Sequence, residues 1–365
     1  MNENFILDAF QRLDMVEYLT GWRLAIMIEI VVFLLIHTSR AYLGLHEERS
    51  FINVFHKLRF QSHETERIDP EVNMNVRIPH GLTNNKSTGP KVVVFLQHGL
   101  LCSATNWVAN LANESLAFLL ADAGFDVWMG NSRGNTYSSR HVKYSPSSEK
   151  FWAFSWDEMA KYDIPAEINY ILAITGQKEL YYVGHSQGTL QAFALFSQNQ
   201  EIAKKVKLFA AMGPVTTISY IESPIKYLSV FSDQLAFDIF GRKDFLPSDL
   251  IIKVLGDTVC KEPVTRWICD DILFLLGGYD INTFTCIYKS YTSSFTGTTP
   301  PLYNVSNMKT PVVLFWGDKD WLADPKDVRE MIPKLYRLVG NYEIKNWNHL
   351  DFIWGIDAAN VLLID

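Results

Sequence analysis

The sequence predicts an α/β protein whose mainly parallel β-sheet is covered by helices on both faces. Apolar runs of strand length, such as 91–97, alternate with longer stretches of helical periodicity, and this alternation is typical of βαβ units. A strand buried on both faces of a parallel sheet reads as an unbroken apolar run. In segment 181–189 a strand, a turn between two glycines and an apolar helix follow one another directly.

The elements of this core can be placed along the chain from their periodicity and punctuation. Expected strands cover 91–97, 125–129, 180–183, 207–212, 311–317 and 341–345, and expected helices cover 107–123 and 157–174. Gly176 follows the second helix, where a glycine commonly ends a helix.

Length and composition limit the classes of protein to consider. A chain of 365 residues, 48% of them hydrophobic, can bury one large core with an inserted subdomain or two medium domains. The net charge of −7 gives no reason to expect nucleic acid as a partner. Cys102, Cys260, Cys269 and Cys286 fit no usual zinc spacing, and we expect neither a metal nor an organic cofactor.

The N-terminal part contains an apolar run at 24–36 that Glu29 interrupts. The run is too short to span a bilayer comfortably but suits the hydrophobic region of a signal peptide. The preceding acidic residues fit that reading poorly, so a buried helix or an uncleaved anchor stays an alternative. We therefore expect residues 1–41 to be a signal peptide or a hydrophobic N-terminal segment. Export would make the sequons at Asn85, Asn113 and Asn304 usable.

The alternation of strands and helices stops between 215 and 305, where amphipathic helical pieces and aromatic residues follow one another. A helical insertion above the carboxyl ends of the strands is suited to covering an apolar substrate. We expect core segments at 42–214 and 306–365, with a cap or lid at 215–305 between them. Cys260 and Cys269 lie within this cap and could close a small loop or stay reduced.

A serine lies at the turn between the strand and the helix of segment 181–189. Gly184 and Gly188 flank it in the pattern G-x-S-x-G, which allows close packing of strand and helix around a strained, exposed serine. The alternative without a catalytic role is a glycine-bounded turn in which Ser186 occurs by chance. A nucleophilic serine also needs a base and an acid that orients the base.

His349 is the only histidine after Ser186 in the sequence, and it follows the last expected strand. Asp320 stands at the end of the preceding strand, and together they give the order Ser, Asp, His. Asp318, Asp324 and Asp327 compete with Asp320, while His349 could instead be an ordinary loop histidine. His185, next to the serine, is expected to pack rather than to act as the base.

Two backbone N–H groups are expected to bind the oxyanion that develops during ester cleavage. Gln187 follows the serine directly, and Leu100 follows a His-Gly turn after the strand 91–97. Any turn between a strand and a helix could use glycine in this way, so the second assignment depends on the rest of the site.

Seven segments resemble signatures of the acid lipase family, the relatives of gastric lipase and lysosomal acid lipase, within the α/β-hydrolases. They are 69–75, 96–107, 122–136, 151–165, 184–189, 320–327 and 347–355. The resemblance implies an α/β-hydrolase fold with a cap, with Ser186 as nucleophile, His349 as general base and Asp320 as its charge partner. It implies an oxyanion hole at Leu100 and Gln187, a disulfide between Cys260 and Cys269, and glycans at Asn113 and Asn304.

The chain also departs from the family pattern. Asn75 runs directly into Val76, where the family has a stretch with early strands, and a long segment is missing between Thr292 and Pro300. The chain further stops soon after Gly355, short of the family's final helix. We therefore expect a smaller cap and an unpaired edge of the sheet.

The function expected from these observations is hydrolysis of neutral lipid esters, triacylglycerol or cholesteryl ester, through an acyl-enzyme. The substrate would be met at a lipid–water interface, with no obligatory protein partner, in the secretory pathway or the lysosome. One alternative is a catalytically impaired or misfolded product that binds lipid, because segments are missing. The other is an esterase of small substrates.

Overall fold

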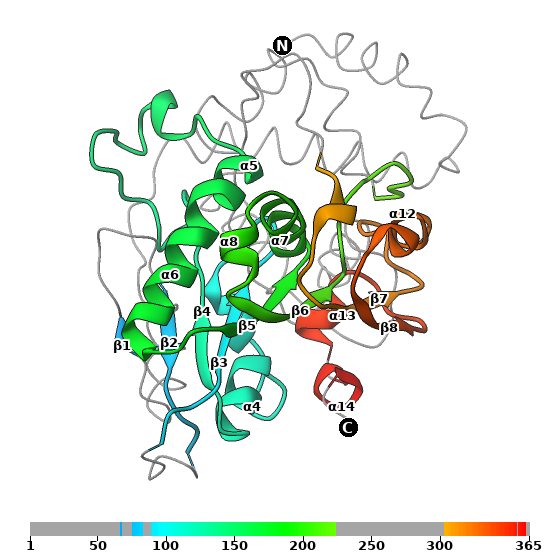
Figure 1. Ribbon diagram of the computed structural model, residues 1–365, viewed down its shortest axis with the longest axis horizontal. Coiled ribbons are helices and arrows are strands. Elements are labelled where there is room, and N and C mark those ends of the chain that lie inside the picture. Colours follow the sequence, from blue (N-terminus) through cyan, green and yellow to red (C-terminus); the bar gives the residue numbers. More distant parts are fainter. Residues whose placement is uncertain (1–65, 68–74, 83–88, 224–302, 356, 363–365) are drawn as a thin grey trace, which may run out of the picture.

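The computed structural model describes residues 66–67, 75–82, 89–223, 303–355 and 357–362. Within these residues the chain forms one eight-stranded sheet in the order β1-β2-β4-β3-β5-β6-β7-β8 (Figure 1). The strands are β1 Glu66–Arg67, β2 Val76–Ile78, β3 Val93–Gln97, β4 Asp126–Met129, β5 Leu180–His185, β6 Val206–Met212, β7 Val312–Gly317 and β8 Leu338–Ile344.

The six strands from β4 to β8 pair in parallel. Their carboxyl ends therefore meet at one edge, which is where ligands bind in open α/β sheets. The predicted α/β fold with a mainly parallel sheet is confirmed.

The outer side of β4 is covered by two short antiparallel strands. Residues 76–78 of β2 pair with β4, and the two residues of β1 pair with β2. The chain just after Asn75 therefore supplies a partner for β4, and the expectation of an unpaired edge at this place is wrong. Arg77 also connects β2 to β4, because its guanidinium donates to both carboxylate oxygens of Asp126, at 2.9 and 2.8 Å.

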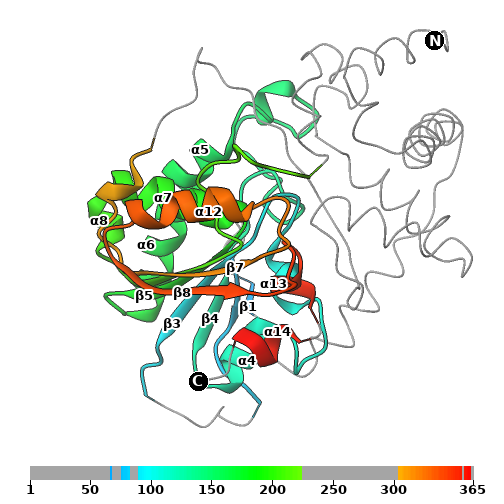
Figure 2. The ribbon, with the colours of Figure 1, turned by 90° about the vertical axis from the view of Figure 1, so that its right-hand side faces the viewer.

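Helices cover both faces of the sheet, as Figure 2 shows from the side. One face carries α6 Ile164–Thr175, α7 Gln187–Gln198, α8 Gln200–Ala203 and α12 Pro325–Met331, and the other carries α4 Leu116–Asp122, α13 Asp351–Trp354 and α14 Ala358–Leu362. Each face has its own cluster of buried apolar side chains. The site residues at the strand ends are thus supported from both sides.

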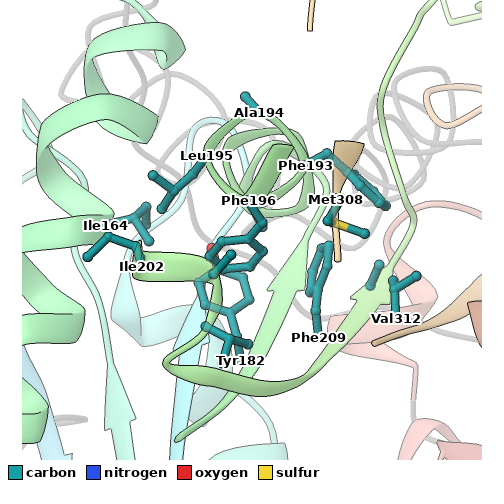
Figure 3. Close-up of a cluster of buried hydrophobic side chains, with 14 of the residues drawn as sticks. Ile164, Tyr182, Phe193, Ala194, Leu195, Phe196, Ile202, Phe209, Met308 and Val312 are labelled. Atoms are coloured by element: carbon teal, nitrogen blue, oxygen red, sulfur yellow. The ribbon is translucent and has the colours of Figure 1, made fainter. Parts of the chain in front are cut away.

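The core under α7 is built from aromatic rings (Figure 3). Tyr182 of β5 meets Phe196 of α7 and Phe209 of β6 edge to face, with ring centroids 5.5 and 5.4 Å apart. Phe193 meets Phe209 in the same way at 5.0 Å. Such pairs add about 0.5–1.5 kcal/mol each beyond their buried area, so α7 is held firmly against β5 and β6.

Two of the expected helices differ from the prediction. The helix expected at 107–123 is divided into the 3₁₀ turn η2 Ala104–Val108 and α4. Ser103 and Ser115 stand at the N-caps of these two helices, and the Ser115 hydroxyl donates to Asn110 O at 2.9 Å. Polar side chains that bond locally to the backbone in this way favour turns over a continuous helix.

The helix expected at 157–174 consists of α5 Trp156–Glu158, the π-helical segment η4 Met159–Asp163 and α6. Pro165 explains the change, because it has no N–H to donate to the preceding turn and stands at the start of α6. Gly176 ends α6 in the left-handed region at φ 67°, and its predicted role is confirmed.

Several predictions fall on residues outside the described part. The N-terminal segment 1–41, the Cys260–Cys269 pair and nearly all of the cap at 215–305 lie there, and they stay predictions. Among the described helices, none is long and apolar enough to cross a membrane.

Candidate active site

Ser186 lies at the turn from β5 to α7 with φ 54° and ψ −118°. This is a strained conformation for a residue with a side chain. It is held in place because Ser186 N donates to Met212 O at 3.0 Å and Ser186 O accepts from Thr189 N at 2.8 Å. The turn therefore presents the serine at the carboxyl edge of the sheet.

The two glycines of the turn are required by close backbone contacts. A Cβ at Gly184 would lie 2.8 Å from Gly188 C and O. A Cβ at Gly188 would lie 2.4 Å from Gln97 O, on the neighbouring strand. The glycines thus let α7 start directly against β3 and β5, as the G-x-S-x-G pattern predicts.

His349 and Asp320 form a buried pair. His349 Nδ1 lies 2.8 Å from Asp320 Oδ2, and the two residues are 2% and 1% exposed. The other carboxylate oxygen of Asp320 accepts from Leu322 N at 2.8 Å and from Ala323 N at 2.7 Å. These donors fix the carboxylate, so that it receives the Nδ1–H and leaves Nε2 as the basic nitrogen.

The basic nitrogen of His349 is buried and has no hydrogen-bond partner among the described residues. A buried polar atom without a partner calls for an explanation. A base waiting for the proton of a nucleophile provides one, since such contacts are often long until substrate is bound.

The acids that compete with Asp320 have other contacts. Asp318 Oδ1 accepts from Asn346 N at 2.5 Å, and Asp324 Oδ1 accepts from Lys326 N at the start of α12. Asp327 accepts from Thr217 Oγ1, Ser219 N and Tyr220 N. The structure therefore brings Asp320, and none of its rivals, to the imidazole.

His185 supports the backbone of His349. Its Nε2–H donates to His349 O at 2.9 Å, and the two ring centroids lie 4.9 Å apart. Burial, followed by the nearby His349, lowers the pKa of His185 to about 3, so its ring is neutral near neutral pH. As expected, His185 packs within the site, where it contacts the ring and backbone of His349.

Gly213 is a contributor that the sequence did not identify. It follows β6 with φ 53°, and a Cβ there would lie 3.1 Å from both Nδ1 and Cε1 of His349. The same Cβ would be 3.6 Å from Asp320 Oδ2. A glycine at this strand end thus leaves the space that the His349–Asp320 pair occupies.

The two predicted oxyanion donors belong to the turn after Ser186 and to the loop after β3, whose Gly99 packs against the serine. Gln187 is the first residue of α7, so its N–H belongs to the unpaired donors of a helix N-terminus. Gly99 packs against the serine, since its Cβ would lie 3.0 Å from Ser186 Cβ. Within the described part of the chain, neither Leu100 N nor Gln187 N donates to another group. Both donors are therefore available.

The loop that carries Leu100 is fixed by His98. Its Nδ1–H donates to Gly99 O at 2.8 Å, and its Nε2 accepts from Ser132 N at 3.1 Å and faces Asn135 Nδ2 at 3.3 Å. Burial lowers the pKa of His98 to about 4. A neutral ring in one tautomer therefore ties the loop after β3 to the loop after β4, a role that the sequence did not reveal.

The remaining predicted sites are only partly described. Asn113 is exposed in the turn before α4, and Asn304 is exposed at the start of the 3₁₀ turn η7 Val305–Asn307. Asn304 Oδ1 accepts from Ser306 N at 3.1 Å. Both asparagines are accessible to a glycan.

The chain is similar to known proteins in sequence. The profile of the α/β-hydrolase fold family matches residues 92–356. Human lysosomal acid lipase/cholesteryl ester hydrolase is 43% identical over 80% of this chain and 89% of its own. Rat gastric triacylglycerol lipase is 46% identical over 77% and 81%, and human lipase member K is 44% identical over 79% and 82%.

Solved structures of low sequence identity share the fold. A Sulfolobus solfataricus protein crystallised as a candidate lipase has a TM-score of 0.54 at 15% identity, over 82% of this chain and 97% of that one. A membrane phospholipase A, a bacterial virulence factor, has a TM-score of 0.50 at 15% identity, over 94% and 96%. At this identity the likeness concerns the fold alone.

The alignment with the human lysosomal enzyme runs over 355 residues but covers only 80% of this 365-residue chain. Some positions of that relative therefore have no counterpart here. This agrees with missing blocks in the chain, whose predicted places are the junction at Asn75 and the stretch between Thr292 and Pro300.

Proposed function

Because the chain belongs to the acid lipase family of α/β-hydrolases, we propose that it hydrolyses carboxylic esters through Ser186, His349 and Asp320. The observation that carries this proposal is the buried contact of 2.8 Å between His349 Nδ1 and Asp320 Oδ2. It leaves Nε2 as the nitrogen that can accept a proton, and this atom has no partner among the described residues, as a general base requires.

Acylation of Ser186 is the first stage of the proposed reaction. His349 Nε2 takes the proton of Ser186 Oγ as that oxygen attacks the ester carbonyl carbon. The carbonyl oxygen becomes an oxyanion that accepts from the N–H groups of Leu100 and Gln187. When the tetrahedral intermediate collapses, the C–O bond to the alcohol breaks, and the alcohol leaves with the proton from His349. An acyl group remains on Ser186.

Release of the acyl group repeats these steps with water. His349 Nε2 takes a proton from the water as its oxygen attacks the acyl carbon, and the same N–H groups stabilise the second oxyanion. Collapse breaks the bond to Ser186 Oγ, which regains its proton from His349, and the fatty acid leaves. The three contacts of Asp320, with His349 Nδ1, Leu322 N and Ala323 N, orient the imidazole and stabilise its charged form.

The substrates that fit this reading are neutral lipid esters, triacylglycerol or cholesteryl ester. The relatives at 43–46% identity are named for these two classes. A helical cap at 215–305 with a Cys260–Cys269 disulfide would cover the acyl chains. Glycans at Asn113 and Asn304, on exposed turns, and a signal at 1–41 fit a lysosomal or secreted enzyme.

Exchange of the nucleophile tests the proposal. Ser186→Ala should lower hydrolysis of a short-chain p-nitrophenyl ester by roughly 10³-fold or more, with an unchanged circular-dichroism spectrum. Ser197→Ala is the matched control, because Ser197 of α7 is buried and donates to Ala194 O inside the core. Turnover that survives Ser186→Ala in folded protein would contradict the assignment.

A smaller substrate is the second candidate, and the unmatched positions of the human relative favour it. A reduced cap would offer less apolar surface to a long acyl chain. A series of esters of increasing acyl length separates the two: kcat/KM that rises with length supports a lipase, and kcat/KM that falls beyond short acyl groups supports an esterase.

A further inference from the structure

Residues 139–150 form an excursion that projects beyond α5, at the upper left of Figure 1. Its tip exposes apolar surface: Val142 is 89% exposed and Tyr144 is 38% exposed. In an aqueous protein such a valine is surrounded by water at a cost of about 1.5 kcal/mol relative to burial. We call residues 139–150 the tip loop.

The tip loop is also locally basic in an acidic chain. It contains Arg140, Lys143 and Lys150 but a single acidic residue, Glu149, whereas the whole chain has a net charge of −7. All three basic side chains are exposed, and none forms an ion pair with a described residue. The loop therefore combines an apolar tip with exposed positive charge.

Internal contacts hold the tip loop in shape. His141 Nδ1 accepts from Lys143 N at 2.9 Å and from Tyr144 N at 3.0 Å, and its ring stacks on Tyr144 with centroids 4.8 Å apart. The loop then returns to a base of buried rings, where Trp152 Nε1 donates to Pro146 O at 2.8 Å. These contacts define the turn between His141 and Tyr144, which holds Val142 at its exposed end.

The base of the tip loop adjoins the candidate active site. The loop after β4 starts at the carboxyl edge of the sheet, and its Ser132 N donates to His98 Nε2 in the turn that carries Leu100. The tip thus projects from the same edge as Ser186.

We propose that the tip loop docks the protein onto an anionic lipid surface, with Val142 and Tyr144 entering the interface and Arg140, Lys143 and Lys150 contacting anionic headgroups. Apolar side chains beside basic ones are the combination that binds such interfaces. The inference deepens the proposed function, since it names the kind of surface on which the lipid ester would be met.

Binding to vesicles tests the tip loop without any turnover. The full chain carrying Ser186→Ala would be sedimented with phosphatidylcholine vesicles, with and without phosphatidylserine. We expect stronger binding to the anionic vesicles, weakened by salt. Arg140→Gln with Lys143→Gln should weaken it by roughly 5-fold per charge removed, and Val142→Ser by about 10-fold.

Matched controls carry the same chemical changes at other places. Lys178→Gln with Lys334→Gln removes two exposed charges just before β5 and β8, at the opposite edge of the sheet, and Val339→Ser alters an exposed valine of β8. Both should bind like the parent. Equal binding to both vesicle types, or equal losses in loop and control variants, would overturn the inference.

Binding to soluble heparin but not to anionic vesicles would also overturn it, since the partner would then be a polyanion. An unchanged melting temperature of the loop variants shows that the chain still folds. Failure of the proposed function would appear separately, as absent ester turnover in the parent enzyme.

Discussion

The buried carboxyl of Glu167 in α6 should make the stability of the folded protein depend on pH. The residue is fully buried, its Oε1 accepts from Asn131 N at 3.3 Å, and its Oε2 has no partner among the described residues. Burial, followed by the nearby Asp163, raises the pKa of Glu167 well above about 4.5. The carboxyl is therefore neutral in the folded protein at pH values where the unfolded chain has ionised it.

The pH dependence follows from this difference. Below about pH 4.5 both states hold the proton, and the group makes no difference to the free energy of unfolding. As the pH rises from there, the unfolded chain loses its proton first, and the folded protein loses up to about 1.4 kcal/mol per pH unit until the raised pKa is passed. Glutamine has nearly the same shape as glutamate and cannot ionise. The free energy of unfolding of Glu167→Gln should therefore not fall in this way as the pH rises.

Urea unfolding measured at several pH values between acid and neutral provides the assay. At the acid end Glu167→Gln should match the wild type within about 1 kcal/mol, because the amide keeps the acceptor for Asn131 N. Toward neutral pH the variant should become progressively more stable than the wild type. Glu179→Gln, an exposed carboxylate before β5, is the control. If the difference in the free energy of unfolding between Glu167→Gln and the wild type stays constant or shrinks as the pH rises, the reasoning is refuted.

Three further substitutions probe the site. Gly213→Ala places a Cβ 3.1 Å from the His349 ring, so kcat should fall about 10-fold or more with little change in KM; an unchanged kcat would show that the ring needs no such space. Gly188→Ala meets Gln97 O at 2.4 Å and should lower the melting temperature clearly, whereas Gly89→Ala, with open space around it, should not. Asp320→Asn should reduce kcat by about 10⁴-fold, measured beside Asp318→Asn, which should stay active.

The strands could be predicted because their signal is local. Runs such as 93–96 are buried on both faces of a parallel sheet, so their residues are apolar without interruption. The helices at 104–122 and 156–175 were less predictable, since a capping serine and Pro165 change the backbone where the apolar spacing continues. Local hydrogen bonds and a missing N–H outweigh periodicity there.

The candidate site also has parts that the local sequence predicts and parts that depend on contacts within the fold. Chain order and strand ends were enough to single out Ser186 and His349 and to indicate an aspartate after β7 between them in the sequence. The choice between Asp318 and Asp320 depends on the turn after β7, where two N–H groups hold Asp320, and the sequence left it open. The parts played by Gly213 and His98 depend on contacts between strand ends far apart in the chain, which spacing does not encode.

Reaction of the chain with a fluorophosphonate tests the central claim most directly, because this reagent reports a serine activated by its neighbours. Mass spectrometry should find one phosphonyl group per folded chain, on Ser186. Labelling should be lost in His349→Ala. It should persist in His80→Ala, the control, because this half-exposed histidine lies far from Ser186 in the sequence. Labelling at another residue, or equal labelling of Ser186 without His349, would contradict the account.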